Sequence, residues 1–316
     1  MKKNLILDVD TGVDDAFAIL FAARHPEINL LGITCVDGNT NLENVIANTL
    51  KTLDAAGAGD IPVARGATRP LIDEPRYAEF VHGSDGLLDM GIPPSKRVLD
   101  PRPAVELIRD LIEGAAGPVT LIPLAPLTNI ALFLRAFPDT AAKLERIVLM
   151  GGSASAGNAT ATAEFNIWHD PEAAAIVFSS GIPITMYGLD VFTRLQLTHD
   201  HGTELKSREH ECSQFSGELI QRFVKQFTAL ADQSEITLGD YGAVATAIAP
   251  HLVTMERYRV VVDTTFGPNR GQTVCDRRTF ADSAQDSIHS NAPSVDVVMD
   301  LDVDAITEMW MRTITQ

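Results

Sequence analysis

Four aspartates lie within eight positions near the N-terminus: Asp8, Asp10, Asp14 and Asp15. Carboxylates this close repel one another strongly once they lose water, unless a cation lies among them. Leu5–Val9 has the apolar pattern of a strand, and the apolar residues after Asp15 recur with helical spacing. Asp14 and Asp15 are therefore expected at a helix N-terminus, which favours negative charge. The pattern predicts a metal site at the C-terminal end of a strand; solvated surface charge is the alternative.

The elements that must position these carboxylates alternate along the chain between short apolar runs and amphipathic stretches. Strands are expected at Leu5–Val9, Leu30–Cys35, Val119–Pro123, Ile147–Met150 and Ile184–Tyr187. Helices are expected at Asp14–Arg24, Leu42–Ala56, Pro103–Glu113, Leu127–Phe137 and Pro171–Ser179. This alternation predicts an α/β fold with an open, mostly parallel, Rossmann-like sheet flanked by helices. In such sheets ligands bind beyond the carboxyl ends of the strands.

Further along, the pattern is more helical and less regular. Helices are expected at Ser216–Ala231, Ala243–Ala249 and Ile306–Arg312, and strands at Tyr258–Asp263 and Ser294–Asp302. We find no repeat, low-complexity tract or linker, so residues 1–316 are expected to form a single domain. The polar loop from Ala67 to Pro101 is long enough to suggest a functional role, and it carries His82.

The net charge, the cysteine content and the apolar runs of the sequence exclude several classes of partner. The formal net charge of −17 argues against nucleic-acid binding and against an anionic membrane surface. The three cysteines are scattered, so neither a disulfide framework nor a zinc site is indicated. Asp8 and Asp10 interrupt the N-terminal apolar run, and no stretch is long enough to span a membrane. These features predict a cytoplasmic protein whose partner is a small, neutral molecule.

The order and spacing of several segments resemble the nucleoside hydrolase family of the inosine-uridine preferring type. The resemblance extends over nearly the whole chain and is most specific at the aspartate run and around Glu164 and Asn166. The other segments that carry it are Val36-Asp-Gly-Asn39, His82-Gly83, Pro123-Leu-Ala-Pro-Leu-Thr-Asn129-Ile-Ala, Met150-Gly-Gly152, Gly157-Asn158, Ala163-Glu-Phe-Asn-Ile-Trp-His-Asp-Pro171, Gly188-Leu-Asp190-Val and Arg270-Gly-Gln-Thr-Val.

The resemblance implies calcium-dependent hydrolysis of the N-glycosidic bond of ribonucleosides to ribose and free base. It implies that Ca²⁺ is bound by the carboxylates of Asp10, Asp15 and Asp240 and by the backbone carbonyl of Leu124, a position where the family usually has threonine. Asp10 is then the general base that takes a proton from the attacking water. The positions that the resemblance assigns to ribose are Asp14, Asn39, Asn158, Glu164 and Asn166. It also implies a homodimer or homotetramer.

One position departs from the family pattern. Well-known members have a histidine directly before the last metal-binding aspartate, where it assists the leaving base, and this chain has Gly239. His82 is the candidate that we favour for leaving-group assistance, because an imidazole titrates near neutral pH. Tyr241 is a second candidate, and protonation of a purine base by solvent is a third possibility. Trp168 is expected to pack in the core.

Two other functions compete with this interpretation. Asp8-Val-Asp10-Thr resembles the nucleophile motif of haloacid-dehalogenase-like phosphatases, and Gly239-Asp240 resembles their acidic metal motif. That class does not account for Asp14-Asp15 or for the segment around Glu164. A degenerate family member that binds calcium and a ribosyl ligand without turnover is the other alternative, motivated by the missing histidine.

Overall fold

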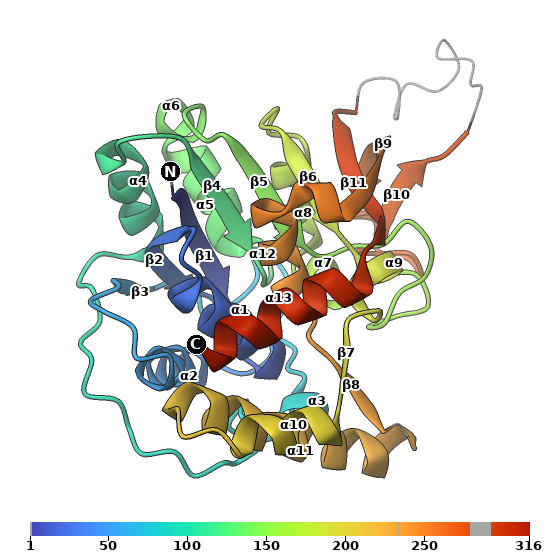
Figure 1. Cartoon of the computed structure of the whole chain (residues 1–316). Coiled ribbons are helices and arrows are strands. Elements are labelled where there is room, and N and C mark those ends of the chain that lie inside the picture. The colour runs from blue at the N-terminus through green and yellow to red at the C-terminus, as the bar shows by residue number, and fades with distance from the viewer. Residues whose placement is uncertain (1, 233, 279–291) are drawn as a thin grey trace.

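A nine-stranded sheet forms the centre of the computed structural model, which describes residues 2–232, 234–278 and 292–316 (Figure 1). Its strand order is β10-β9-β11-β6-β5-β4-β1-β2-β3. The strands are β1 Lys3–Val9, β2 Ile28–Cys35, β3 Val63–Arg65, β4 Val119–Pro123, β5 Arg146–Met150, β6 Ile184–Tyr187, β9 Val253–Val262, β10 Thr273–Asp276 and β11 Ser294–Leu301. A separate two-stranded sheet pairs β7 Gln196–Thr198 with β8 Glu235–Thr237.

All pairs from β11 across to β3 are parallel, and β9 pairs antiparallel with both β11 and β10. The expectation of a mostly parallel α/β sheet is confirmed, and each of the five strands expected in the first part of the chain is present. The antiparallel part of the sheet differs from the simple alternating pattern because β9 runs antiparallel to both of its neighbours, β11 and β10.

Helices cover both faces of the sheet, and each face has its own hydrophobic core. In β1, Leu5, Leu7 and Val9 point into one core and Ile6 into the other, as the two-residue period of a strand requires. The first core is closed by α1 Val13–Arg24, α2 Leu42–Ala55, α11 Glu211–Ala231, α12 Tyr241–Ile248 and α13 Val303–Thr315. The second is closed by α4 Ala104–Gly114, α5 Thr128–Ala136 and α8 Pro171–Phe178.

Shorter helices lie in the connections. They are α3 Glu79–His82, α6 Pro138–Ala141, α7 Phe165–His169, α9 Leu189–Phe192, α10 His199–Lys206 and the 3₁₀ turn η1 Pro250–Leu252. In Figure 1, α10 and α11 lie together at one end of the molecule, joined to the rest through β7 and β8. Within the described part of the chain, no helix has the length and apolar character needed to cross a membrane.

The position of the site follows from the strand order. The chain leaves β1 toward β2 on one side, and β4 returns on the other side of β1, so the order reverses between β1 and β4. Such a reversal opens a crevice at the carboxyl ends of the strands. Asp10 directly follows β1 and Leu124 directly follows β4. The Leu124 N–H donates to the Asp8 carbonyl at 2.8 Å, which fixes the two strand ends beside each other.

Candidate active site

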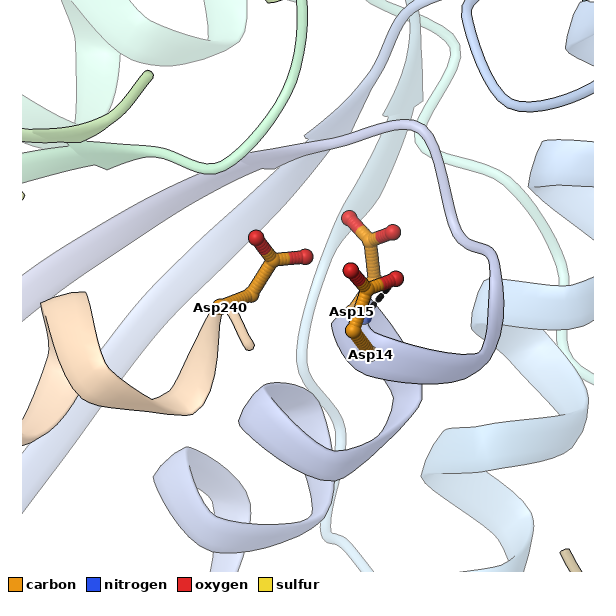
Figure 2. A group of neighbouring side chains, drawn as sticks. All are labelled: Asp14, Asp15 and Asp240. Carbon is orange, nitrogen blue, oxygen red and sulfur yellow. Dashed lines mark hydrogen bonds between the residues drawn. The ribbon is translucent and has the colours of Figure 1, made fainter. Parts of the chain in front are cut away.

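Three carboxylates meet at this edge of the sheet. Asp14 and Asp15 are in the first turn of α1, and Asp240 is at the start of α12. Figure 2 shows the three side chains directed toward the same space, and one oxygen from each lies within 4.8 Å of the others. Two helix N-termini therefore face one acidic group, and their free N–H groups and dipoles favour the negative charge there.

Backbone and side-chain hydrogen bonds hold the carboxylates of Asp10 and Asp15 in place. Asp15 accepts hydrogen bonds from the N–H groups of Asp10 at 3.2 Å and Gly12 at 2.9 Å, and from the Asn39 side-chain amide at 3.2 Å. Asp10 accepts from the Asn39 N–H at 2.7 Å through Oδ2, while its buried Oδ1 has no hydrogen-bond partner among the described residues. A buried carboxylate oxygen without a donor is costly unless it is protonated or binds a cation.

The pKa values of these carboxyl groups also indicate a site for a cation. Burial, reinforced by the neighbouring Asp14 charge, raises the pKa of Asp15 to about 8. Burial and the Asp15 charge raise the pKa of Asp10 well above its usual range, and burial and the Asp14 charge do the same for Asp240. These carboxyls therefore need either protons or a cation at neutral pH. An all-oxygen donor set suits a hard divalent cation such as Ca²⁺.

Glu164 and Asn166 extend the site away from the carboxylates. Glu164 is the N-cap of α7, and it accepts from the N–H groups of Gly152 and Asn166, each at 2.9 Å, and of Ile167 at 3.2 Å. Burial raises its pKa to about 7. The Asn166 amide donates to the Leu124 carbonyl at 2.9 Å, which is the carbonyl that the resemblance assigns to the metal. Glu164 thus supports the fold as well as facing the cavity.

A cavity of about 470 Å³ opens above these groups. All the predicted site residues line it except Asp10 and Asp15, which lie at its base behind Asn39 and Asp14. The lining members are Asp14, Asn39, His82, Leu124, Asn158, Glu164, Asn166 and Asp240. The structure thus brings residues from six separate segments to one hollow with a polar, acidic floor.

His82 lies at the N-terminus of α1, where its ring has a defined tautomer. Nδ1 accepts the Val13 N–H at 3.2 Å, so the proton of the neutral ring is on Nε2. Burial lowers the pKa of His82, and the Asp14 carboxylate, 4.0 Å from Nδ1, opposes that shift. The neutral form therefore predominates at pH 7, and Nε2–H is the donor that His82 offers to a ligand.

The family model of the inosine-uridine preferring nucleoside hydrolases matches residues 5–308. The chain belongs to this family. Nucleoside hydrolases are enzymes that cleave N-glycosidic bonds, and the chain accordingly hydrolyses ribonucleosides to ribose and free base. The family, the fold class and this activity, all expected from the sequence, are confirmed.

Relatives with this activity match over almost their full length. The pyrimidine-specific ribonucleoside hydrolase RihA of Photobacterium profundum is 40% identical over 286 residues, which cover 90% of this chain and 92% of that protein. The non-specific ribonucleoside hydrolase RihC of Escherichia coli is 38% identical over 314 residues, which cover 99% and 98%. The solved structure of a purine-preferring ribonucleoside hydrolase from Gardnerella vaginalis has a TM-score of 0.90 at 33% identity and covers 99% of this chain and 98% of its own. A plant nucleoside hydrolase structure has a TM-score of 0.93 at 29% identity, with 100% and 99% covered.

The backbone of this nucleoside hydrolase explains the glycine at position 239. Gly239 has a left-handed φ of +51°, and a Cβ there would lie 2.8 Å from the Asp14 Cβ and 2.8 Å from the Phe192 ring. A histidine here would be strained in this conformation and would require Asp14 or Phe192 to shift. Tyr241 does not replace it either, because Tyr241 is fully buried and its hydroxyl donates to the Ile306 carbonyl at 2.8 Å. Of the two side-chain candidates for leaving-group assistance, only His82 reaches the cavity.

Sequence reasoning missed the aromatic part of the cavity wall. Trp168 was expected in the core, and this expectation is wrong: it lines the cavity, with the Arg76 guanidinium 4.3 Å from its ring centre. Phe223 and Phe227, four residues apart on α11, also face the cavity. The remaining aromatic lining residues are Tyr77, Phe80, Phe165 and Phe192. Helical spacing at Phe223 and Phe227 was visible in the sequence, but the same spacing is typical of core packing.

Proposed function

We propose that this nucleoside hydrolase is calcium-dependent, with Asp10 as its general base. The observation that carries the proposal is the acidic floor of the cavity, where Asp14, Asp15 and Asp240 converge and the buried Asp10 Oδ1 has no partner. A phosphatase does not require so many dehydrated carboxylates under polar groups suited to a diol. Ribose release distinguishes turnover from binding of calcium and a ribosyl ligand alone. A homo-oligomeric state and a cytoplasmic location are predictions that accompany this proposal.

The residues that would hold the ion are those that the family resemblance gives: Asp10, Asp15, Asp240 and the Leu124 carbonyl. Asp15 and Asp240 form one group with Asp14, which is therefore near enough to share in the coordination. A calcium ion bound there would orient the attacking water and the ribose diol and would favour loss of the water's proton. Asp10 accepts that proton. Asn39 keeps the Asp10 carboxylate in place through its N–H, and it fixes Asp15 through its side chain.

Ribose recognition falls to the polar groups around the floor. Asp14, Asn39, Asn158, Glu164 and Asn166 offer carboxylate and amide groups, which pair with sugar hydroxyls. The Asn158 side-chain Oδ1 already accepts the Phe165 N–H at 2.9 Å, so the side-chain N–H₂ group is the part left for a ligand. The base then lies against the aromatic side of the cavity, where stacking and burial do not depend on one pattern of hydrogen bonds.

Leaving-group assistance is assigned to His82. Its Nε2–H donates a hydrogen bond to the departing base as negative charge develops on it, and the neutral ring needs no prior protonation to do so. This assignment fits the lowered pKa of His82 better than delivery of a proton from a standing imidazolium.

The test is ribose release from inosine, uridine, cytidine, adenosine, guanosine and nicotinamide riboside, before and after chelation. The proposal predicts that a calcium chelator abolishes ribose release and that added Ca²⁺ restores it, with bound calcium found by elemental analysis. Full activity in a metal-free preparation, or activity that follows zinc, would contradict calcium dependence. A binding protein would release no ribose, and a phosphatase would release phosphate from phosphomonoesters instead.

A further inference from the structure

Arg270, outside the groups assigned so far, is the centre of a buried ion cluster between β9 and β10. Its side chain is 10% exposed, and those of its two carboxylate partners, Asp73 and Glu172, are 13% and 19% exposed. Nε and Nη2 donate to Asp73 at 3.2 and 3.0 Å, and Nη1 and Nη2 donate to Glu172 at 2.8 and 2.9 Å. Nη1 also donates to the Thr264 carbonyl at 2.7 Å. All five guanidinium N–H groups are thus used.

The partners come from segments that are far apart in sequence. Asp73 belongs to the long loop that leads from β3 into α3, and Glu172 is in the first turn of α8. The loop continues to Arg76 and Tyr77, which line the cavity, and α8 follows α7, whose Trp168 lines it as well. Arg270 therefore joins two segments just behind the cavity wall.

Two further contacts connect the cluster to that wall. Asp73 also forms an ion pair with Arg76 at 3.7 Å, and the Arg76 guanidinium lies over the Trp168 ring at 4.3 Å. Gly271, the residue after Arg270, has a φ of +85°, and a Cβ there would be 2.7 Å from the Trp168 Cα. The backbone next to Arg270 thus packs directly on Trp168, while its side chain fixes the loop that covers the ring.

The low exposure of the cluster distinguishes it from an ordinary surface ion pair. Exposed pairs contribute little, because solvent screens them and long side chains lose entropy. Here two carboxylates face one guanidinium, largely out of water. Removing the guanidinium takes from Glu172 its ion-pair partner and leaves Asp73 with the longer 3.7 Å contact to Arg76. The Asp73 segment of the loop then loses its hydrogen bonds to Arg270.

We propose that Arg270 is a positioning residue, which fixes the Arg76–Trp168 wall of the cavity and thereby sets the affinity for the riboside. This inference rests on the proposed function, since the wall is taken to contact substrate. A wall that is fixed before binding stabilises the bound substrate and the transition state alike. Its loss therefore raises KM and leaves kcat nearly unchanged.

The kinetic test compares Arg270→Met with a matched control. Arg102 is also bound by two carboxylates, Asp100 and Asp110, but it does not line the cavity and is more exposed. For Arg270→Met we expect KM for ribosides to rise about tenfold, with kcat within about threefold of wild type, whereas Arg102→Met changes neither. Arg270→Lys keeps the charge but not the fork, so its effect is intermediate.

A second readout does not depend on activity. The chain has two tryptophans, and Trp310 is fully buried, so quenching of fluorescence by acrylamide reports on Trp168. We expect Arg270→Met to increase the quenching constant about twofold, because Arg76 no longer stays over the ring, and Arg102→Met to leave it unchanged. Asp73→Ala keeps Arg270 and removes its contact with the loop together with the Asp73–Arg76 pair. It serves as the second variant where Arg270→Met does not fold, and we expect it to raise both KM and quenching. Asp110→Ala is its control.

The outcomes separate this inference from the proposed function. Unchanged KM and quenching in Asp73→Ala or in folded Arg270→Met would overturn it, as would equal effects of Arg102→Met or a loss of kcat at constant KM. If wild-type protein released no ribose while quenching still rose only in the Arg270 and Asp73 variants, the proposed function would fall and the positioning of the wall would stand.

Discussion

Replacement of His82 by alanine tests the proposed route by which the base departs. The change removes the Nε2–H donor and the Nδ1 acceptor for the Val13 N–H, and it leaves the ring of Phe223, whose centre is 6.2 Å from that of His82, without its neighbour. A hydrogen bond to a charged partner contributes about 1.5–3 kcal/mol. At 1.36 kcal/mol per factor of ten, that corresponds to a loss of about 10- to 150-fold in kcat for uridine and cytidine.

The assay compares these nucleosides with p-nitrophenyl riboside, whose leaving group needs no donor. Because the ribose half is identical, any damage to the floor of the site or to α1 affects both substrates equally. We expect slow cleavage of the nucleosides and nearly normal cleavage of the p-nitrophenyl compound. His25→Ala, at the opposite end of α1, serves as the control for removing a buried histidine. Equal slowing of both substrates by His82→Ala would refute the role of His82 and reduce it to shaping the pocket.

Four further predictions follow from the geometry. Asp10→Asn keeps an oxygen at the floor but removes the proton acceptor, so turnover should fall by about 10²–10⁴ with nucleoside binding largely kept, and retention of a tenth of the wild-type rate would place the base elsewhere. Asn166→Ala should narrow the preference for ribosides over 2′-deoxyribosides by the value of one hydrogen bond, about 0.5–1.5 kcal/mol, measured as the ratio of kcat/KM. Calcium-free protein should lose thermal stability as the pH rises from about 4 to 8, because the pKa of Asp15 is raised from 3.8 to about 8 and the native state therefore holds more protons than the unfolded state in this window. Added Ca²⁺ should raise Tm more at pH 8 than at pH 6. A Tm that rises with pH in the calcium-free protein would show that the carboxylate cluster is not desolvated. Gly239→His should lower activity and should destabilise the protein by more than the about 1–2 kcal/mol cost of a side chain in the left-handed conformation, measured as a fall in Tm. Gly57→His is the control, because its φ is +62° but a Cβ there has no described atom within 4 Å, so it should show only that cost. A gain of activity in Gly239→His would contradict the packing seen at Asp14 and Phe192.

The first half of the fold could be predicted because its signals are local. Leu5–Val9 and Val119–Pro123 are apolar runs of strand length, and in the structure both are buried from both faces of a parallel sheet. The antiparallel edge was less visible. The strand expected at Tyr258–Asp263 begins at Val253 in the structure. Its first half was missed because Glu256 and Arg257 give it a polar pattern, which fits a half that pairs with β11 while β10 pairs only with Arg259–Val262.

The candidate site also has residues that local sequence signals predicted and residues that they did not. The density of charge at Asp10, Asp14 and Asp15 has no easy structural explanation, so the sequence alone indicated a cation site. Asp240 has no local signal, and only the family resemblance indicated it before the structure placed it beside Asp14 and Asp15. The partners of Arg270, Asp73 and Glu172, are 197 and 98 positions away from it, so no pattern in the sequence relates them.

The two helices that supply the acidic floor also determine when a newly made chain becomes active. Asp15 follows the first strand, but Asp240 starts α12, and the core beneath α12 is completed by α13 at the C-terminus. A chain truncated before α12 has Asp14 and Asp15 but lacks Asp240. If the proposed ion site is correct, such a chain would lack a ligand and would not hydrolyse ribonucleosides. The acidic floor is complete only after α12 has been made, so the topology itself would keep shorter copies of the enzyme inactive.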